Sequence, residues 1–447
     1  MDFSINSQEL VEPATRASEA PRICDSKFME VANNNSKPEK LSQPLFNVGL
    51  LGNVSAGKSS VVRALTGIET TRHSKEKERG ITMKIGYANC KIFKCTICPA
   101  PQCYYPSSSK EDKYKCSCGT DCELVQHISF IDCPGHESLM NTMLSGGTIM
   151  DYAILLIDGS QKCPQPQTVE HLMALEILQV RKILIIQNKL DLIDGNRAMA
   201  QYKEIKEFVK GTCAENSPII PMSAQKKYNL DTLCEYLHKY FEPIPRTANN
   251  IRMNVIRSFD INKPGCEIID LKGGVLGGSI LSGALNNGEI IEIRPGLVKK
   301  DAKNVLSWAP ITTKIISMQS DNNQLGTAMS GGLIGVCTSL DPSLCRSDRM
   351  VGQVVGIPGT LPDEFTCINA ECKFLKRTDK KTSTPKKDSI LLLNISSKPV
   401  RAIIVKIEKP IYHLELQYPC CMVPNEKFSI STAIDNTWKL IGMGRSV

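Results

Sequence analysis

The feature that most constrains this chain is a glycine-rich turn between an apolar run and a helical segment. The apolar run is Leu45–Leu51, and the turn GNVSAGKS follows at Gly52–Ser59. It matches the phosphate-loop pattern, in which backbone N–H groups turn inward around phosphates and a helix adds the positive end of its dipole. Lys58 is expected to reach the β- and γ-phosphates, and the Ser59 hydroxyl to bind Mg²⁺. The residues expected to line the nucleotide here are Asn53, Val54, Ser55, Ala56, Gly57, Lys58, Ser59 and Ser60.

A second group of residues has the chemistry to complete a magnesium and γ-phosphate site. Asp132 follows an expected strand at Ser129–Ile131, where its carboxylate would hold Mg²⁺ through water. Gly135, three residues on, would offer its amide to the γ-phosphate. Thr82 lies between the phosphate loop and Asp132, and its hydroxyl would complete the Mg²⁺ shell.

A third group predicts selectivity for guanine. Asp191, in the turn NKLD, follows an expected strand at Lys182–Ile186, and its carboxylate can accept both N1–H and N2–H of guanine. Adenine has no such donor pair. The turn at Ser223 suits a backbone contact to guanine O6. The residues assigned to the base are Asn188, Lys189, Asp191, Ser223, Ala224 and Gln225.

The remaining pattern divides the chain into a leader and three folded regions. Residues 1–40 are polar and are predicted to be a disordered leader. Residues 41–245 alternate β-rich runs with helical segments, which predicts an α/β P-loop GTPase domain with a doubly wound, mostly parallel sheet. Glycine-rich turns then separate Val/Ile-rich runs. They predict two antiparallel β-barrel domains, at 246–356 and 357–447.

Composition adds limits rather than a function. The formal net charge of +8 permits an anionic partner such as RNA, but equally serves solubility. No apolar run reaches the length of a membrane span, and the first residues lack the pattern of a signal peptide, so a cytoplasmic protein is expected. With 19 cysteines and no export signal, buried thiols and metal ligands are favoured over a disulfide framework.

Several segments resemble translational GTPases related to elongation factor Tu. RGIT at 79–82 and DCPGH at 132–136 resemble the switch segments of these proteins. Further segments are similar to the gamma subunit of initiation factor 2, and the resemblance runs from about Phe46 almost to the end. These segments are 84–89, 163–168, 255–265, 270–275 and 331–335.

The resemblance implies a function and roles for individual residues. The GTP form would carry initiator methionyl-tRNA to the small ribosomal subunit, in a heterotrimer with alpha and beta subunits, and release it after GTP hydrolysis at the start codon. His136 would orient the attacking water, with Lys58 and Thr82 completing the catalytic group. Val54 and Ile81 would form an apolar gate beside the water. Intrinsic hydrolysis would be slow, so exchange and GTPase-activating factors are expected partners.

Two positions depart from the family pattern. Ala56 stands where family members commonly have His, and Ser60 stands where Thr is common. Neither change removes a phosphate or Mg²⁺ ligand, so GTP binding is expected. Two alternatives stay open. Ala56 leaves room for a nucleotide-binding scaffold subunit with little or no hydrolysis, and a related elongation or selenocysteine-type factor would share the switch segments and the barrels.

A cysteine-rich insert at 95–122 predicts a Zn²⁺ site. Two clusters separated by a polar loop fit tetrahedral thiolate ligation, which would hold a segment too small and polar to fold by burial. Gamma subunits have a similar zinc knuckle at this place. Six cysteines compete for four positions, and the alternative is a loop that binds no metal. The preferred ligands are Cys95, Cys98, Cys118 and Cys122.

Overall fold

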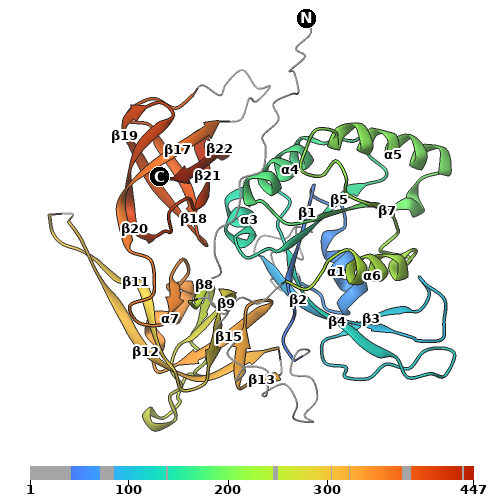
Figure 1. Ribbon diagram of the computed structural model, residues 1–447, viewed down its shortest axis with the longest axis horizontal. Helices are drawn as coiled ribbons and strands as arrows, with labels where there is room; N and C mark the ends of the chain where they lie inside the picture. The colour runs from blue at the N-terminus through green and yellow to red at the C-terminus, as the bar shows by residue number, and fades with distance from the viewer. Residues whose placement is uncertain are drawn as a thin grey trace, which may run out of the picture. The chain divides into compact units, whose positions relative to one another are not determined.

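The computed structural model describes residues 42–70, 85–136, 139–244, 250–303, 305–321, 323–374, 384–434 and 437–447 (Figure 1). Two sequence predictions, the leader at 1–40 and the Mg²⁺ ligand Thr82, lie outside these residues, as does the gate residue Ile81.

The first folded region is built on a mixed sheet. Within the described residues the sheet has seven strands in the order β3-β2-β4-β1-β5-β6-β7. Strands β1, β4, β5, β6 and β7 run parallel to one another, as expected, whereas β2 and β3 are antiparallel additions at one edge. The strands are β1 (Asn47–Gly52), β2 (Gly86–Lys94), β3 (Tyr104–Ser108), β4 (Glu123–Asp132), β5 (Tyr152–Asp158), β6 (Ile183–Asn188) and β7 (Ile219–Pro221).

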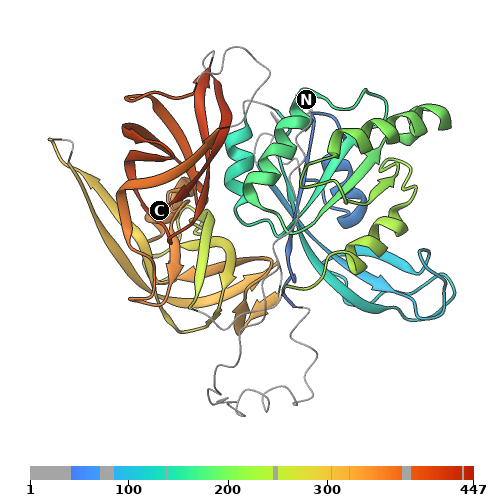
Figure 2. The same cartoon turned by 45° about the horizontal axis from the view of Figure 1, so that its top comes forward.

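Helices cover both faces of this sheet, which is the doubly wound arrangement (Figure 2). Neighbouring residues of β1 show why both faces are covered. Leu50 packs into one core and Leu51 into another, because successive strand side chains point to opposite faces. The first core receives α1 (Lys58–Thr66) and α6 (Leu230–Lys239), and the second receives α3 (Met140–Gly147), α4 (Pro166–Leu178) and α5 (Gly195–Val209).

Part of the cysteine-rich insert is ordered by burial, which differs from the expectation that it is too small and polar for this. Strand β3 pairs with β2 at the sheet edge, and helix α6 packs against β3. Tyr104 and Cys103 are consequently buried in the core that also contains Leu233. The reason is that the insert extends an existing sheet, so it shares the core of the larger domain.

The second region is an antiparallel barrel. In its described residues the ring runs β11-β16-β8-β9-β15-β12, and pairing of β11 with β12 closes it. Strand β13 adds to β12, and β10 pairs with β14. The strands are β8 (Arg252–Phe259), β9 (Val275–Ser282), β10 (Ala284–Asn286), β11 (Ile290–Lys300), β12 (Leu306–Ser320), β13 (Asn323–Leu325), β14 (Thr327–Met329), β15 (Leu333–Thr338) and β16 (Val354–Gly356).

The third region is a second closed antiparallel barrel, with the order β17-β20-β19-β18-β21-β22 among the residues described. The inward side chains of its strands form a core of their own, which includes Leu393, Ile404 and Ile430. The strands are β17 (Glu364–Phe374), β18 (Ile390–Ile395), β19 (Lys398–Glu408), β20 (Ile411–Cys421), β21 (Lys427–Ile434) and β22 (Thr437–Ser446).

Short helical turns complete the described elements: η5 (Leu190–Leu192), η6 (Ile268–Asp270), α7 (Pro342–Cys345) and η7 (Arg346–Asp348). None of the described helices is long and apolar enough to cross a membrane.

Candidate functional site

The phosphate loop joins the end of β1 to the first turn of α1. Gly57 adopts a left-handed conformation, with φ of 95°, immediately before the helix begins at Lys58. A Cβ added at Gly57 would lie 2.3 Å from Nδ2 of Asn188, so only glycine fits between the loop and that side chain. The loop is therefore shaped by contact with the turn after β6 as well as by its own sequence.

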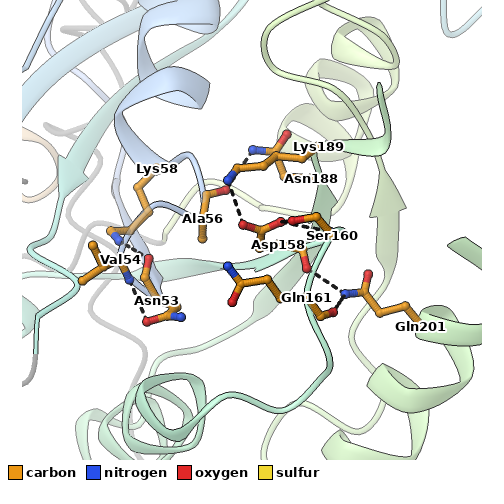
Figure 3. A network of polar contacts seen from close by, with 10 residues as sticks. All are labelled: Asn53, Val54, Ala56, Lys58, Asp158, Ser160, Gln161, Asn188, Lys189 and Gln201. Atoms are coloured by element: carbon orange, nitrogen blue, oxygen red, sulfur yellow. Dashed lines mark hydrogen bonds and ion pairs between the residues drawn. The ribbon is translucent and has the colours of Figure 1, made fainter. Parts of the chain in front are cut away.

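Lys58 lies across the loop that it is expected to serve. Its Nζ donates to the carbonyl oxygen of Asn53 at 2.8 Å (Figure 3) and to that of Gly52 at 2.9 Å. Burial lowers the pKa of this ammonium to about 8, although the carboxylate of Asp132 acts in the opposite direction. The side chain is thus held as a buried cation at the concave side of the loop.

The side chains of Ser59 and Asp132 bring two oxygen-bearing groups together near Lys58. The Ser59 hydroxyl donates to Oδ2 of Asp132 at 2.6 Å. The alignment is set by the sheet, because Asp132 ends β4 and is paired in register with Leu50 of β1. A hydroxyl and a carboxylate are the hard ligands that Mg²⁺ prefers, so these residues fit the ion.

The DCPGH turn lies directly against the loop. A Cβ at Gly135 would come within 2.5 Å of Lys58 Nζ and 2.9 Å of the Val54 backbone nitrogen. A side chain at this position would therefore push the turn away from the phosphates. His136 follows and is exposed, which leaves it accessible to a water or a partner.

The turn NKLD (188–191) follows β6 and is called the base turn below. It is connected to the phosphate loop through the side chain of Asn188. Its Nδ2 donates to the carbonyl of Ala56 at 2.9 Å, and its Oδ1 accepts from the backbone N–H of Ala224 at 3.1 Å. All three residues are buried. One side chain therefore joins the three turns that sequence analysis assigned to the nucleotide.

Asp158 is a member of the site that sequence analysis missed. It ends β5, and its Oδ2 accepts from Lys189 Nζ at 2.7 Å, while its Oδ1 accepts from the Ser160 hydroxyl at 2.6 Å (Figure 3). Burial alone would raise the pKa of Asp158, but the bonds from Lys189 and Ser160 hold it below its usual value. Gln201 of α5 donates to the Asp158 carbonyl at 2.7 Å. The network fixes the ammonium end of Lys189 against Asp158.

Asp191 is oriented by Ser223, which lies in the turn SAQ (223–225) after β7. The Ser223 hydroxyl donates to Asp191 Oδ1 at 2.5 Å and accepts from the Lys226 backbone N–H at 3.1 Å. The bond from Ser223 lowers the pKa of Asp191, so the carboxylate is kept ionised. A cavity of about 930 Å³ opens here, lined on its other side by Tyr104 and Tyr105 of β3.

Three predicted residues lie at the rim of the site, with exposed side chains: Ser55, Ser60 and Gln225. Their side chains do not contribute to the hydrogen bonds described above. Their backbone N–H groups belong to the two turns that were assigned to the nucleotide.

The cysteine insert gathers four thiols. The Sγ atoms of one group all lie within 4.8 Å of one another, and the group consists of Cys95, Cys98, Cys116 and Cys118. Three of these are residues that the sequence analysis preferred, with Cys116 in the place assigned to Cys122. Tyr105 hydrogen-bonds to Cys116 at 3.1 Å, and this bond is the main cause that lowers the pKa of Cys116, to about 5.

Two known protein families match this chain, one over the first folded region and one over the last barrel. The pattern of the elongation factor Tu GTP-binding domain matches residues 43–243. That of the C-terminal region of initiation factor eIF2 gamma matches residues 368–446.

Two curated relatives match almost the whole chain. Eukaryotic translation initiation factor 2 subunit 3 of Drosophila melanogaster is 48% identical over 426 residues, which is 91% of this chain and 90% of the relative. Eukaryotic translation initiation factor 2 subunit gamma of Schizosaccharomyces pombe is 47% identical over 419 residues, covering 91% of this chain and 94% of the relative.

Solved structures at lower identity share the fold. A bacterial selenocysteine-specific elongation factor, EF-Sec, superposes with a TM-score of 0.66 at 20% identity, covering 90% of this chain and 58% of that one. Elongation factor SelB from Methanococcus maripaludis, in complex with a GTP analogue, gives 0.65 at 19% identity, covering 90% of this chain and 78% of that one. These likenesses concern the arrangement of the three regions.

Proposed function

The chain belongs to the family of gamma subunits of eukaryotic translation initiation factor 2, and on this premise we propose that its GTP-bound form delivers initiator methionyl-tRNA to the small ribosomal subunit. Release of the tRNA follows GTP hydrolysis at the start codon. The observation that carries the proposal is that the phosphate loop, the DCPGH turn and the base turn meet in one site, in a chain 48% identical to such a subunit.

The activity underlying this function is that of a translational GTPase with a GTP or GDP and Mg²⁺ site. We assign the phosphates to the loop amides and to Lys58, whose Nζ exchanges the carbonyls of Gly52 and Asn53 for phosphate oxygens. Ser59 and Thr82 would hold Mg²⁺ directly, and Asp132 would hold it through a water molecule. When bound there, Mg²⁺ would neutralise the charge that develops during phosphoryl transfer.

Guanine recognition is assigned to Asp191, with its two acceptor oxygens directed by Ser223. Lys189, whose Nζ is bonded to Asp158, is assigned to the face of the base. The Ala224 N–H, which donates to Asn188 Oδ1, is assigned to guanine O6 as a second, shared acceptor. Hydrolysis is assigned to His136, which would orient the attacking water, and the amide of Gly135 would donate a hydrogen bond to a γ-phosphate oxygen.

The four gathered thiols support a structural Zn²⁺ site. Four sulfur atoms within 4.8 Å of one another match the ligand number and type of closed zinc sites. The residues that would hold the ion are Cys95, Cys98, Cys116 and Cys118. Its contribution would be to fix the end of the insert that β3 and the sheet core do not already order.

We propose further protein partners because of the family to which the chain belongs. An alpha and a beta subunit complete the heterotrimer, and exchange and GTPase-activating factors act on the nucleotide site. Two alternative functions are less well supported. Retention of Asp132, Gly135 and His136 favours hydrolysis over a purely scaffolding role, and the match of residues 368–446 favours initiation over elongation.

Binding of aminoacylated initiator tRNA to the full-length protein tests the proposal. Affinity is measured with a non-hydrolysable GTP analogue and with GDP, in the presence and absence of alpha and beta subunits. Elongator methionyl-tRNA is the control. Tight binding that requires both the GTP analogue and the initiator tRNA is expected. Equal affinity in the two nucleotide states, with all subunits present, would overturn the proposal.

A further inference from the structure

Asp132 accepts two short hydrogen bonds at one carboxylate oxygen, and only one donor belongs to the phosphate loop. Ser59 Oγ lies 2.6 Å from Oδ2, and Thr70 Oγ1 lies 2.5 Å from the same atom. Thr70 is only 7% exposed and Asp132 is fully buried. Hydrogen bonds to an ionised acceptor are stronger than neutral ones, and burial protects these from competition by water.

The chain places Thr70 at this carboxylate by a specific route. Helix α1 ends at Thr66, and Gly67 in the left-handed conformation, with φ of 71°, terminates it. Three residues later the chain lies beside Asp132. Because Thr70 immediately precedes the 71–84 segment that contains Thr82, its hydrogen bond connects the entrance of that segment to strand β4.

The sheet provides a space that fits the threonine side chain. Gly86 of β2 is paired in register with Asp132 of β4. A Cβ added at Gly86 would lie 2.7 Å from the Cβ of Thr70 and 3.4 Å from the Cβ of Asp132. The lack of a side chain at Gly86 therefore allows Thr70 to reach the carboxylate.

We propose that Thr70 is a positioning residue for the Mg²⁺ site. Its hydroxyl fixes the carboxylate of Asp132, and the carboxylate in turn orients the Ser59 hydroxyl through the proton that Ser59 donates to Oδ2. The inference rests on the proposed assignment of Ser59 and Asp132 to Mg²⁺. Groups that orient metal ligands typically contribute about 10- to 100-fold to metal affinity.

The test measures Mg²⁺ dependence rather than turnover. Release of a fluorescent GDP analogue from the full-length protein is followed across a Mg²⁺ titration and in EDTA. We expect Thr70→Val to require about tenfold more Mg²⁺ for half-maximal retention, with release in EDTA unchanged. Thr70→Ser, which keeps the hydroxyl, restores the wild-type midpoint.

A matched control is available in the same stretch of chain. Thr66 is also buried, and its hydroxyl donates to the Val62 carbonyl at 2.7 Å rather than to Asp132. Thr66→Val is expected to leave the Mg²⁺ midpoint unchanged. An unshifted midpoint in Thr70→Val, an equal shift in Thr66→Val, or an equal acceleration of release in EDTA would each overturn the inference.

Two further variants keep the result interpretable. If Thr70→Val does not fold, Gly86→Ala displaces Thr70 while retaining its hydroxyl, and we expect the same rise in the Mg²⁺ requirement. A wild-type midpoint in Gly86→Ala contradicts the inference.

Ser59→Ala separates the role of Thr70 from the proposed assignment of Mg²⁺ to Ser59 and Asp132. If it leaves the Mg²⁺ response intact, the Mg²⁺ assignment itself is wrong, whereas a lost response in Ser59→Ala with a normal Thr70→Val refutes only the role of Thr70.

Discussion

The side-chain amide of Asn188 donates a 2.9 Å hydrogen bond to the carbonyl oxygen of Ala56. The base turn and the phosphate loop are therefore joined directly by a hydrogen bond within the protein. Since Ala56 precedes Gly57, the bond also holds the loop at the point where it turns into α1. The two halves of the nucleotide site are arranged by one buried side chain.

Asn188→Ala should therefore weaken nucleotide binding without removing a residue that contacts phosphate. The buried carbonyl of Ala56 and the N–H of Ala224 both lose their partner, at a cost of about 1–3 kcal/mol each. We expect lower GDP affinity by calorimetry and reduced resistance to urea. Asn323→Ala is the control, because Asn323 lies on β13 of the first barrel and its side chain donates to the Ser42 carbonyl at 3.0 Å. Equal behaviour of the two variants would contradict the connecting role.

Asp191→Asn should change which base is preferred. The amide replaces one acceptor oxygen with a donor, which no longer suits N2–H of guanine but suits the O2 of xanthine. Loss of a hydrogen bond to a charged acceptor predicts about a tenfold to hundredfold weaker GDP binding. The measurement is competition between GDP and xanthosine diphosphate. Asp194→Asn, which changes the N-cap of α5, serves as the control; an unaltered preference in Asp191→Asn would refute the assignment.

Much of the nucleotide site could be predicted because its residues obey local rules. Parallel strands end at one edge of the sheet, so the turns after β1, β4 and β6 must meet there. Asp158, which ends β5, obeys the same rule and could have been found by it. Gln201 could not, since it lies within α5 and its bond to Asp158 depends on how that helix packs.

The cysteine-rich insert shows a second limit of sequence analysis. Spacing along the chain identified the insert but could not choose four thiols from six. The choice depends on the hairpin in which β3 returns along β2, and the structure places Cys116 opposite Cys98, with their Sγ atoms 3.5 Å apart. Cys122 lies on the approach to β4, outside the group.

Substitution of individual cysteines should separate the two ligand sets. We expect Cys116→Ala to lose bound zinc in elemental analysis of the full-length protein, and Cys122→Ala to retain one equivalent. Loss of a thiolate leaves three ligands, which is too few for a closed structural site. The reverse outcome would favour the set that includes Cys122. Cys103→Ala is the control for removing a buried cysteine of the insert that is not in the group.

His136→Ala should separate nucleotide binding from hydrolysis. The side chain is exposed and is not assigned to phosphate or base, so GTP affinity is expected to stay near wild type. Loss of a group that orients and activates water predicts a fall of about 10²-fold or more in stimulated hydrolysis. Single-turnover assays with ribosomes and the activating factor measure this. Undiminished hydrolysis would remove His136 from the catalytic group.

His171 of α4 should make the protein less stable in mild acid. It is fully buried, and burial, together with the charge of Lys58, lowers its pKa from 6.5 to about 3. Between these values the unfolded chain binds a proton that the folded protein does not, so stability falls as the pH decreases through 6.5. From pH 7 to pH 5 this histidine should cost about 2 kcal/mol.

Urea unfolding at pH 7 and pH 5 provides the measurement. Replacement of the buried histidine by the non-titrating amide in His171→Gln should reduce the acid-induced loss of stability by about 2 kcal/mol relative to wild type. His413→Gln is the control, since His413 lies at the surface of the second barrel, where it contacts Glu408. If wild type and His171→Gln lose stability equally between the two pH values, His171 is not held neutral in the folded protein.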